Sequence, residues 1–170
     1  MTLDLGIEPL SRSHDRTAFN CGVPALDRYF REQASQDIKR RVGNCFVAVD
    51  SNIGAIAGYY TLAASSVPVA SLPEDQTNRL PRYPLLPAIL IGRLAVDIHY
   101  QGQRVGSVLL ANALRRSAEA APASFALIVD AKDDGAAAFY RKHGFTPFRS
   151  RPLSLFLPIA TALKLFSQHS

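Results

Sequence analysis

The segment LIGRLAVDIHYQGQRVGSVLL, residues 90–110, decides the fold because it joins a buried strand, a short polar loop and the start of a helix. Residues 88–96 are apolar apart from Gly92 and Arg93, which is typical of a central strand covered on both faces. A helix is expected at 105–121. Its first N–H groups lack intrahelical partners, so a glycine-containing loop before it can bind phosphate. Taken alone, such glycines are more often turn residues than ligands, and the spacing fits neither GxGxxG nor GxxxxGK[ST].

The flanking sequence alternates strands and helices, which predicts a mixed α/β fold. Towards the amino terminus we expect a strand at 3–10, an amphipathic helix at 23–41, an antiparallel pair of strands at 45–49 and 55–69, and a polar connection outside the core at 71–87. Towards the carboxyl terminus we expect a strand at 125–129, a helix at 133–143, strands at 146–148 and 153–157, and a short helical tail.

Length and composition favour one globular domain over residues 1–170, with 48% hydrophobic and 19% charged residues. Cys21 and Cys45 form no CxxC pair, which argues against a disulfide framework and a zinc site. The sequence shows no secretory signal and no segment of the ~20 apolar residues that span a bilayer, so we expect a cytoplasmic protein without membrane passage. The net charge of +5 either serves solubility or indicates a polyanionic partner.

Two motifs in this order, residues 90–110 and DAKDDGAAAFYRKHGFTPF at 130–148, resemble the GNAT superfamily of acetyl-CoA-dependent N-acetyltransferases. The resemblance extends to FNCGVPALDRYFREQA at 19–34 and GYYTLAA at 58–64, so it covers most of the chain. The whole pattern is similar to the toxin branch of type II toxin–antitoxin modules, whose members acetylate aminoacyl-tRNA. It implies the α/β GNAT fold, with a mixed, mostly antiparallel central sheet of six to seven strands flanked by about four helices.

The resemblance also implies where acetyl-CoA binds. The pantetheine arm is expected on the strand and the pyrophosphate on the loop and helix start, with these contacts: Leu94, Ala95, Val96, Gln101, Gly102, Gln103, Arg104, Val105, Gly106, Ser107 and Phe139. The family's loop reads Gln or Arg, two residues, Gly, one residue, Gly or Ala. Here Arg104 takes the first glycine position, where its guanidinium either pairs with a CoA phosphate or blocks the loop and leaves a protein without cofactor.

Tyr140 lies in FYRKHGF, where the resemblance places a general acid. Acetyl transfer from a thioester to an amine expels a thiolate, and a phenol with a pKa near ~10 can donate a proton to it. The alternative is that Tyr140 and Phe139 only anchor their helix to the sheet.

A general base is hard to find in this sequence. None of the four glutamates lies on the central strand, and Asp97 at its end is either a base acting through water or a solvated carboxylate. An α-amine, with a pKa of about 7.7 to 8.0, is partly deprotonated near neutral pH, so it depends less on a general base than a lysine amine with a pKa near ~10.4. The sequence therefore suits a substrate of low amine basicity.

Basic residues outside the motifs are candidates for contacts to tRNA phosphates. The expected surface combines the end of the first helix with arginines of the connection and the central strand: Lys39, Arg40, Arg41, Arg79, Arg82 and Arg93. His14, His99, His143 and His169 are scattered, so we expect no catalytic triad and no metal site.

The leading hypothesis is a toxin that acetylates the α-amine of aminoacyl-tRNA and blocks translation by direct attack on acetyl-CoA. The resemblance further implies a homodimer and an antitoxin of ribbon-helix-helix type. One alternative is a small-molecule or protein N-acetyltransferase, although a cationic drug would require a more acidic pocket. Another is a GNAT scaffold that binds a partner and no longer uses cofactor.

Overall fold

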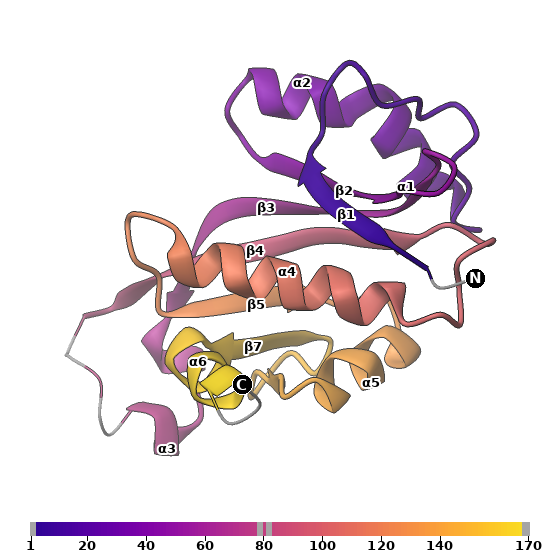
Figure 1. Ribbon diagram of the computed structural model, residues 1–170. Coiled ribbons are helices and arrows are strands. Elements are labelled where there is room, and N and C mark those ends of the chain that lie inside the picture. Colours follow the sequence, from indigo (N-terminus) through magenta and orange to yellow (C-terminus); the bar gives the residue numbers. More distant parts are fainter. Residues whose placement is uncertain (1–2, 78–79, 81–82, 168–170) are drawn as a thin grey trace. The chain divides into compact units, whose positions relative to one another are not determined.

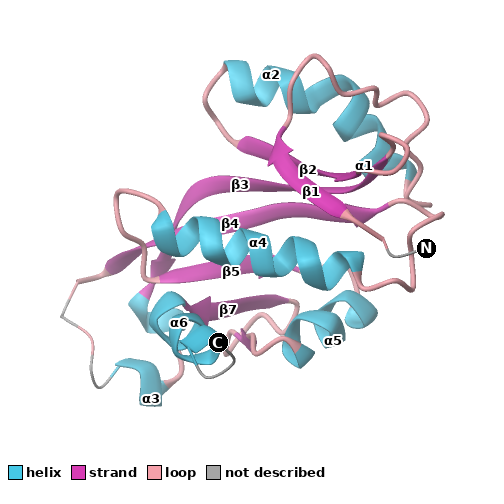
Figure 2. Ribbon diagram, viewed as in Figure 1, coloured by secondary structure: helices cyan, strands magenta, loops and turns pink. Residues whose placement is uncertain are grey.

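The computed structural model describes residues 3–77, 80 and 83–167 of the chain. Seven strands are hydrogen-bonded in the order β1-β2-β3-β4-β5-β7-β6. The pair β4 and β5 is parallel, whereas the β1–β2, β2–β3, β5–β7 and β6–β7 pairs are antiparallel. The expected mixed α/β fold with a mostly antiparallel seven-stranded sheet is therefore confirmed (Figure 2).

The elements follow the order predicted from the sequence, with ends shifted by a few residues. The strands are β1 (Leu5–Pro9), β2 (Asn44–Asp50), β3 (Ile56–Pro68), β4 (Leu85–Val96), β5 (Ala126–Asp130), β6 (Thr146–Pro147) and β7 (Ser154–Pro158). The helices are α1 (Pro24–Arg28), the π-helical turn η1 (Tyr29–Gln33), α2 (Ala34–Lys39), the 3₁₀ turn η2 (Val69–Ser71), α3 (Glu74–Thr77), α4 (Val105–Glu119), α5 (Asp134–Lys142) and α6 (Ile159–Ser167).

The chain divides into two compact units, which are described separately. The first unit is Met1–Ala63 with Gly92–Ala113, and the second is Ala64–Ile91 with Leu114–Ser170. Strands β3 and β4 and helix α4 contribute residues to both units.

In the first unit, β3 is packed on both faces because its successive side chains point in opposite directions. On one face, Tyr59 stacks on Phe30 of η1 with ring centroids 4.3 Å apart, and Phe19 meets both rings edge-on. On the other face, Gly58 allows α4 to approach, because a Cβ there would lie 2.9 Å from Leu109. Figure 1 shows the α1 to α2 run beside the indigo and purple strands β1 and β2 of this unit.

Helix α2 ends in a Schellman motif with an arginine where glycine is usual. The Val42 N–H donates to the Asp37 carbonyl at 3.0 Å, and the Arg41 N–H donates to the Ile38 carbonyl at 3.1 Å. Arg41 has φ of 61°, in the left-handed region. The chain therefore turns directly from α2 into β2 and leaves the Arg41 side chain exposed.

In the second unit, β4, β5 and β7 carry a core that includes Val67, Leu86, Phe148 and Phe156. Leu72 is also buried in this core, at 1% exposure. The prediction that 71–87 lies outside the core is therefore wrong, because these apolar side chains fold inward from an otherwise polar segment.

The strand expected at 88–96 is covered along its length, because all of its residues except Gly92 are buried or half-buried. β4 begins three residues earlier than expected, and from Leu85 to Ala88 its side chains alternate between exposed and buried. The start of the strand therefore buries one face.

Candidate functional site

The loop between β4 and α4 is anchored at its start and near its middle by two buried carboxylates of the first unit. Asp50 accepts a 2.6 Å hydrogen bond from the Tyr100 hydroxyl. Burial and this hydrogen bond to a carboxylate raise the pKa of Tyr100 to about 12. Asp97 accepts hydrogen bonds from the backbone N–H groups of Asn20 at 3.0 Å and His99 at 2.9 Å. The loop is thus held before any ligand arrives.

Two glutamine side chains brace the same loop from within. The Gln101 amide donates to the carbonyls of Cys21 at 3.0 Å and Val96 at 2.9 Å. The Gln103 amide donates to the His99 carbonyl at 3.2 Å. Both residues are expected from the sequence to bind the cofactor, and their side chains stabilise the loop. Only the backbone groups of Gln101 and Gln103 therefore remain for contact with a phosphate.

The turn into α4 uses two residues with positive φ. Gly102 has φ of 81°, and a Cβ added there would meet no heavy atom within 4 Å. Arg104 has φ of 64° and an exposed side chain. Glycine takes this conformation without strain, whereas an arginine in it costs about 1 to 2 kcal/mol. The family's glycine at this position therefore has a conformational reason, and Arg104 adopts the same backbone.

The loop and the helix start fit a pyrophosphate. The space above Gly102 is open, and Gln101 to Arg104 are exposed. α4 begins at Val105, so the N–H groups of its first turn point out of the helix start and carry the positive end of its dipole. A diphosphate would meet this row of donors and the Arg104 guanidinium.

The end of β4 carries the residues expected to hold the pantetheine arm. Leu94 and Val96 are half-buried and Ala95 is buried at 5% exposure. A Cβ on Gly58 would lie 2.8 Å from the Ala95 carbonyl oxygen, so β3 approaches this segment closely. The strand end is therefore firmly supported from one side.

Asp97 is a structural carboxylate, and the prediction that it is solvated is wrong. Its side chain is buried, at 5% exposure. Burial by itself would raise its pKa, but hydrogen bonds from Asn20 and His99 outweigh burial and hold the pKa below its usual range. A carboxylate so engaged is a weak base.

Tyr140 lies on α5 in the second unit and is buried at 8% exposure. The rings of Phe139 and Phe145 meet it edge-on, with centroids 5.2 Å and 5.5 Å away. Its hydroxyl forms no hydrogen bond within residues 3–77, 80 and 83–167, although a buried tyrosine usually finds a partner. Burial raises the pKa of Tyr140 to about 12, so the phenol keeps its proton at neutral pH. A protonated hydroxyl without a hydrogen-bond acceptor among the described residues is suited to donate its proton to a bound substrate.

Part of the predicted basic surface comes together in the first unit. The Arg93 guanidinium carbon lies 3.5 Å from the centroid of the Tyr29 ring, and the Tyr29 hydroxyl donates to Asp37 at 2.7 Å. Arg93 and Arg40 both lower the pKa of Asp37, after its hydrogen bonds from Tyr29 and Gln33. Arg93 is therefore anchored beside the helix that carries the Lys39 to Arg41 cluster, whose side chains are exposed. Arg79 and Arg82 lie outside the described residues.

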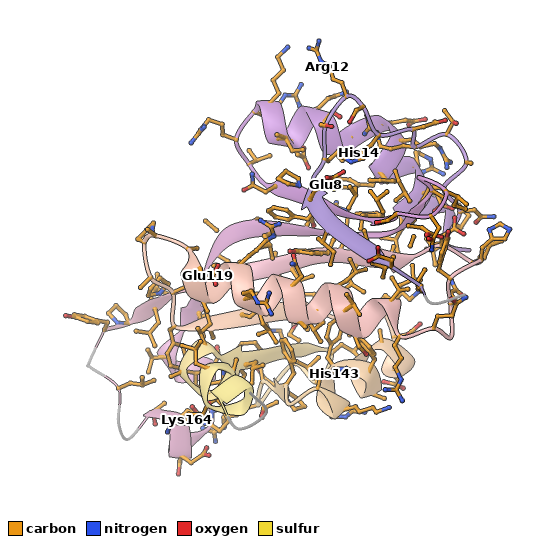
Figure 3. All side chains as sticks on the ribbon, viewed as in Figure 1. Glu8, Arg12, His14, Glu119, His143 and Lys164 are labelled. Atoms are coloured by element: carbon orange, nitrogen blue, oxygen red, sulfur yellow. The ribbon has the colours of Figure 1, made fainter. Side chains whose placement is uncertain are left out.

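The described histidines each have a local partner. His14 lies beside Glu8, with Nε2 2.6 Å from the carboxylate (Figure 3). His99 lies 2.8 Å from Asp97, and His143 Nδ1 lies 2.8 Å from the Phe139 carbonyl at the end of α5. Across the described part of the chain, no three His, Cys, Asp or Glu side chains are grouped to hold a metal ion. His169 lies outside the described residues.

A cavity of about 170 Å³ in the second unit was missed by the sequence reasoning. It is lined by segments of β3, β4, β5 and the loop before β7, including Ser66, Leu90, Ile128, Phe148 and Arg151. No local motif could have revealed it, because the lining residues are scattered over more than 80 positions of the chain.

Comparison with known proteins shows the family of the chain, and its relatives include two toxins. The acetyltransferase (GNAT) domain matches residues 41–147. A probable toxin TacT of Sinorhizobium fredii is 32% identical over 169 residues, covering 94% of this chain and 93% of the relative. A tRNA-acetylating toxin of Mycobacterium tuberculosis is 36% identical over 158 residues, covering 92% of this chain and 93% of the relative.

Solved structures resemble the chain over nearly its whole length. AtaT complexed with acetyl-methionyl-tRNAfMet gives a TM-score of 0.87 at 30% identity and covers 96% of this chain and 99% of AtaT. AtaTR bound with acetyl-CoA gives 0.81 at 30% identity, covering 96% and 98%. An AtaT tyrosine-to-phenylalanine variant bound to the carboxyl terminus of the antitoxin AtaR gives 0.79 at 28% identity, covering 96% and 98%.

Proposed function

The chain belongs to the GNAT acetyltransferase family, and from this premise we propose that it transfers an acetyl group from acetyl-CoA to the α-amine of aminoacyl-tRNA. The observation that carries the proposal is the likeness to AtaT complexed with acetyl-methionyl-tRNAfMet, at a TM-score of 0.87. The tRNA-acetylating toxin of M. tuberculosis supports the same substrate class. Such an enzyme would act as a toxin by blocking translation.

Acetyl-CoA supplies the acetyl thioester, and the first unit holds its diphosphate. We assign this binding to the backbone of Gln101, Gly102 and Gln103, to the N–H groups of Val105, Gly106 and Ser107, and to the Arg104 guanidinium. Leu94, Ala95 and Val96 receive the pantetheine arm, and Phe139 packs against the cofactor. Because Gln101 and Gln103 hold the loop in place beforehand, little ordering is left for the binding step.

Tyr140 is the proposed catalytic acid. Its phenol keeps its proton at neutral pH because burial raises the pKa to about 12. As the bond between the acetyl carbonyl carbon and sulfur breaks, the negative charge on the departing sulfur takes up this proton. The absence of a hydrogen bond to the Tyr140 hydroxyl within the described residues leaves it available for that role.

The amine is proposed to attack in its neutral form without a dedicated base. β4 carries no carboxylate between Leu85 and Val96, and Asp97 is occupied by hydrogen bonds. An α-amine, with a pKa of about 7.7 to 8.0 before esterification lowers it, is substantially neutral at pH 7 to 8. A lysine side chain would be almost fully protonated there.

The tRNA is proposed to lie along Lys39, Arg40, Arg41 and Arg93, extended by Arg79 and Arg82. The first three are exposed at the end of α2, and Arg93 is fixed against Tyr29 on the same helical run. Such contacts neutralise phosphates without reading sequence.

Further partners follow from the same family likeness. We propose neutralisation by an antitoxin of ribbon-helix-helix type, a homodimer and a cytoplasmic location. AtaT is bound to the carboxyl terminus of its antitoxin AtaR in one of the similar structures. Among the described residues, no helix is long and apolar enough to span a membrane.

The test is incubation of the purified protein with labelled acetyl-CoA and a pool of charged tRNAs. We expect label in the aminoacyl fraction and none on the same tRNAs after deacylation. Label found only on free amines or on proteins would rule out aminoacyl-tRNA as the substrate. Calorimetry with acetyl-CoA separates the remaining alternative, since a scaffold without cofactor would give no heat of binding.

A further inference from the structure

Arg93 lies on the sheet face that the α1 to α2 run covers. Successive side chains of a strand point to opposite faces, so Arg93 shares a face of β4 with Ala95. Ala95 is buried in one core cluster with Phe30 and Tyr59, and Tyr29 packs against that cluster. The guanidinium carbon lies 3.5 Å from the centroid of the Tyr29 ring, so one face of this planar cation rests on the ring. Arg93 is therefore held in one plane by a contact within the first unit.

The N–H edge of this guanidinium has no acceptor in the described part of the chain. Within residues 3–77, 80 and 83–167, Arg93 forms no ion pair with a carboxylate and donates no hydrogen bond. The side chain is half-buried, and a guanidinium carries five N–H donors and a permanent charge. A planar cation with one face covered and its donor edge open is suited to two parallel hydrogen bonds to a phosphate.

Asp37 is close enough to Arg93 to be affected by its charge, but other side chains engage both oxygens of this carboxylate. The Tyr29 hydroxyl donates to Oδ2 at 2.7 Å, and the Gln33 amide donates to Oδ1 at 3.1 Å. These hydrogen bonds, and after them the charges of Arg93 and Arg40, lower the pKa of Asp37, so it is ionised at neutral pH. Burial and the hydrogen bond to Asp37 raise the pKa of Tyr29, which keeps its proton. Tyr29 therefore contacts the cation with its ring and the anion with its hydroxyl.

The backbone that carries Tyr29 is a π-helical turn. η1 begins at Tyr29, and the Ala34 N–H donates to the Tyr29 carbonyl, five residues back in the chain. Such turns are rare in proteins and frequently occur at functional sites. The widened turn thus begins at the residue that contacts both Arg93 and Asp37.

We propose that Tyr29 positions Arg93 to bind one phosphate of the tRNA. The ring fixes the plane of the guanidinium, and the hydroxyl holds Asp37 away from it, so that two N–H groups of Arg93 face the phosphate. Without the hydroxyl, Asp37 turns to Arg93, pairs with it and neutralises the charge that the phosphate needs. The proposal rests on the proposed function and adds the residue that keeps one of its phosphate contacts open.

The experiment measures binding of methionine-charged tRNA by filter binding over a salt series. Tyr29→Phe keeps the ring and lacks the hydroxyl, so affinity should fall about tenfold, as expected for one charge-assisted contact. The slope of log affinity against log salt should fall by about 0.7 to 0.9, because one phosphate is no longer neutralised. Adding Asp37→Asn to Tyr29→Phe removes the competing charge and should restore both values. Tyr59→Phe is the matched control, because it loses a hydroxyl that donates to the Leu26 carbonyl at 2.7 Å and should change neither value.

A second variant keeps the test valid if Tyr29→Phe fails to fold. Arg93→Lys keeps the charge but lacks the planar pair of donors, so affinity should fall about tenfold while the salt slope stays unchanged. If the wild type acetylates charged tRNA, two results would overturn the role of Tyr29 alone. One is wild-type affinity and slope in every folded variant, and the other is a loss in Tyr29→Phe that Asp37→Asn does not restore. A wild type that neither binds nor acetylates charged tRNA would overturn the proposed function and this inference with it.

Discussion

Two arginines hold left-handed backbone conformations that glycine would adopt more easily. Arg41 and Arg104, at φ of 61° and 64°, are the non-glycine residues with positive φ in the described chain. Each costs about 1 to 2 kcal/mol of strain, and each presents an exposed guanidinium at a place proposed to meet phosphate. Strain kept at such positions is commonly linked to function.

Arg104→Gly decides between the two roles considered for this arginine. If the guanidinium pairs with a CoA phosphate, KM for acetyl-CoA rises about tenfold, the order of one charge-assisted hydrogen bond. Arg104→Ala should have the same raised KM for acetyl-CoA as Arg104→Gly, because both variants lack the guanidinium. Since alanine retains the backbone strain, its free energy of unfolding should be about 1 kcal/mol below that of the glycine variant. Steady-state kinetics and urea unfolding measure both. A fall in KM in Arg104→Gly would instead indicate that the side chain obstructs the loop.

Tyr140→Phe should lower turnover by about 10² or more and leave acetyl-CoA affinity nearly unchanged, because the variant lacks only the proton donor. In the wild type, a pKa of about 12 keeps the phenol protonated, so activity should rise with pH as the amine loses its proton and should not fall from tyrosine ionisation below pH 11. Single-turnover rates across pH check this. Tyr83→Phe, at an exposed tyrosine, is the control. Unchanged turnover in Tyr140→Phe would mean that another group donates the proton.

At the scale of elements, close packing around β3 determines where the cofactor loop lies. Within the amphipathic helix expected at 23–41, Phe30 and Ala34 are buried, and Leu26, Tyr29 and Gln33 are half-buried. The opposite face of β3 admits α4 at Gly58 only because no Cβ intervenes. Since α4 begins at the end of the loop, its seating on β3 fixes the helix start.

Gly58→Ala is therefore expected to destabilise the fold by about 1 to 3 kcal/mol through overpacking. The added Cβ would lie 2.8 Å from the Ala95 carbonyl oxygen, and backbone cannot move aside cheaply. Urea unfolding measures the change. Gly6→Ala, where a Cβ meets nothing within 4 Å and φ is not positive, should stay within about 0.5 kcal/mol of the wild type. Equal stability of the two variants would show that α4 is not seated on β3 as described.

At the scale of the whole molecule, the net charge of +5 would favour binding of the negatively charged tRNA that we propose as the substrate. β3, β4 and α4 pass through both compact units, and we propose that the two units form the single domain expected from the chain length. The positive charges proposed to meet the acceptor stem are gathered at the end of α2, with Arg93 beside the same helical run.

Replacing Lys39, Arg40 and Arg41 together by alanine should weaken tRNA binding and reduce its salt dependence. The slope of log affinity against log salt should fall by about 0.7 to 0.9 for each phosphate that the protein no longer neutralises. Filter binding over a salt series measures it. Replacing Arg115, Lys132 and Lys142, which are also exposed, removes the same three charges and should change the slope much less. Equal slopes in the two triple variants would locate the tRNA elsewhere.

The sequence by itself determined the order of elements, the strand, loop and helix of residues 90–110, and Tyr140 within FYRKHGF, because these depend on residues near one another in the chain. Tertiary structure decided the rest. Asp97 accepts a hydrogen bond from Asn20, 77 positions away, and Arg93 lies over the ring of Tyr29. The cavity around Leu90 and the one-sided burial of the start of β4 likewise arise from distant segments. Periodicity and motifs reflect local geometry, whereas the burial of a side chain and its hydrogen-bond partners depend on contacts between segments that are distant in the sequence.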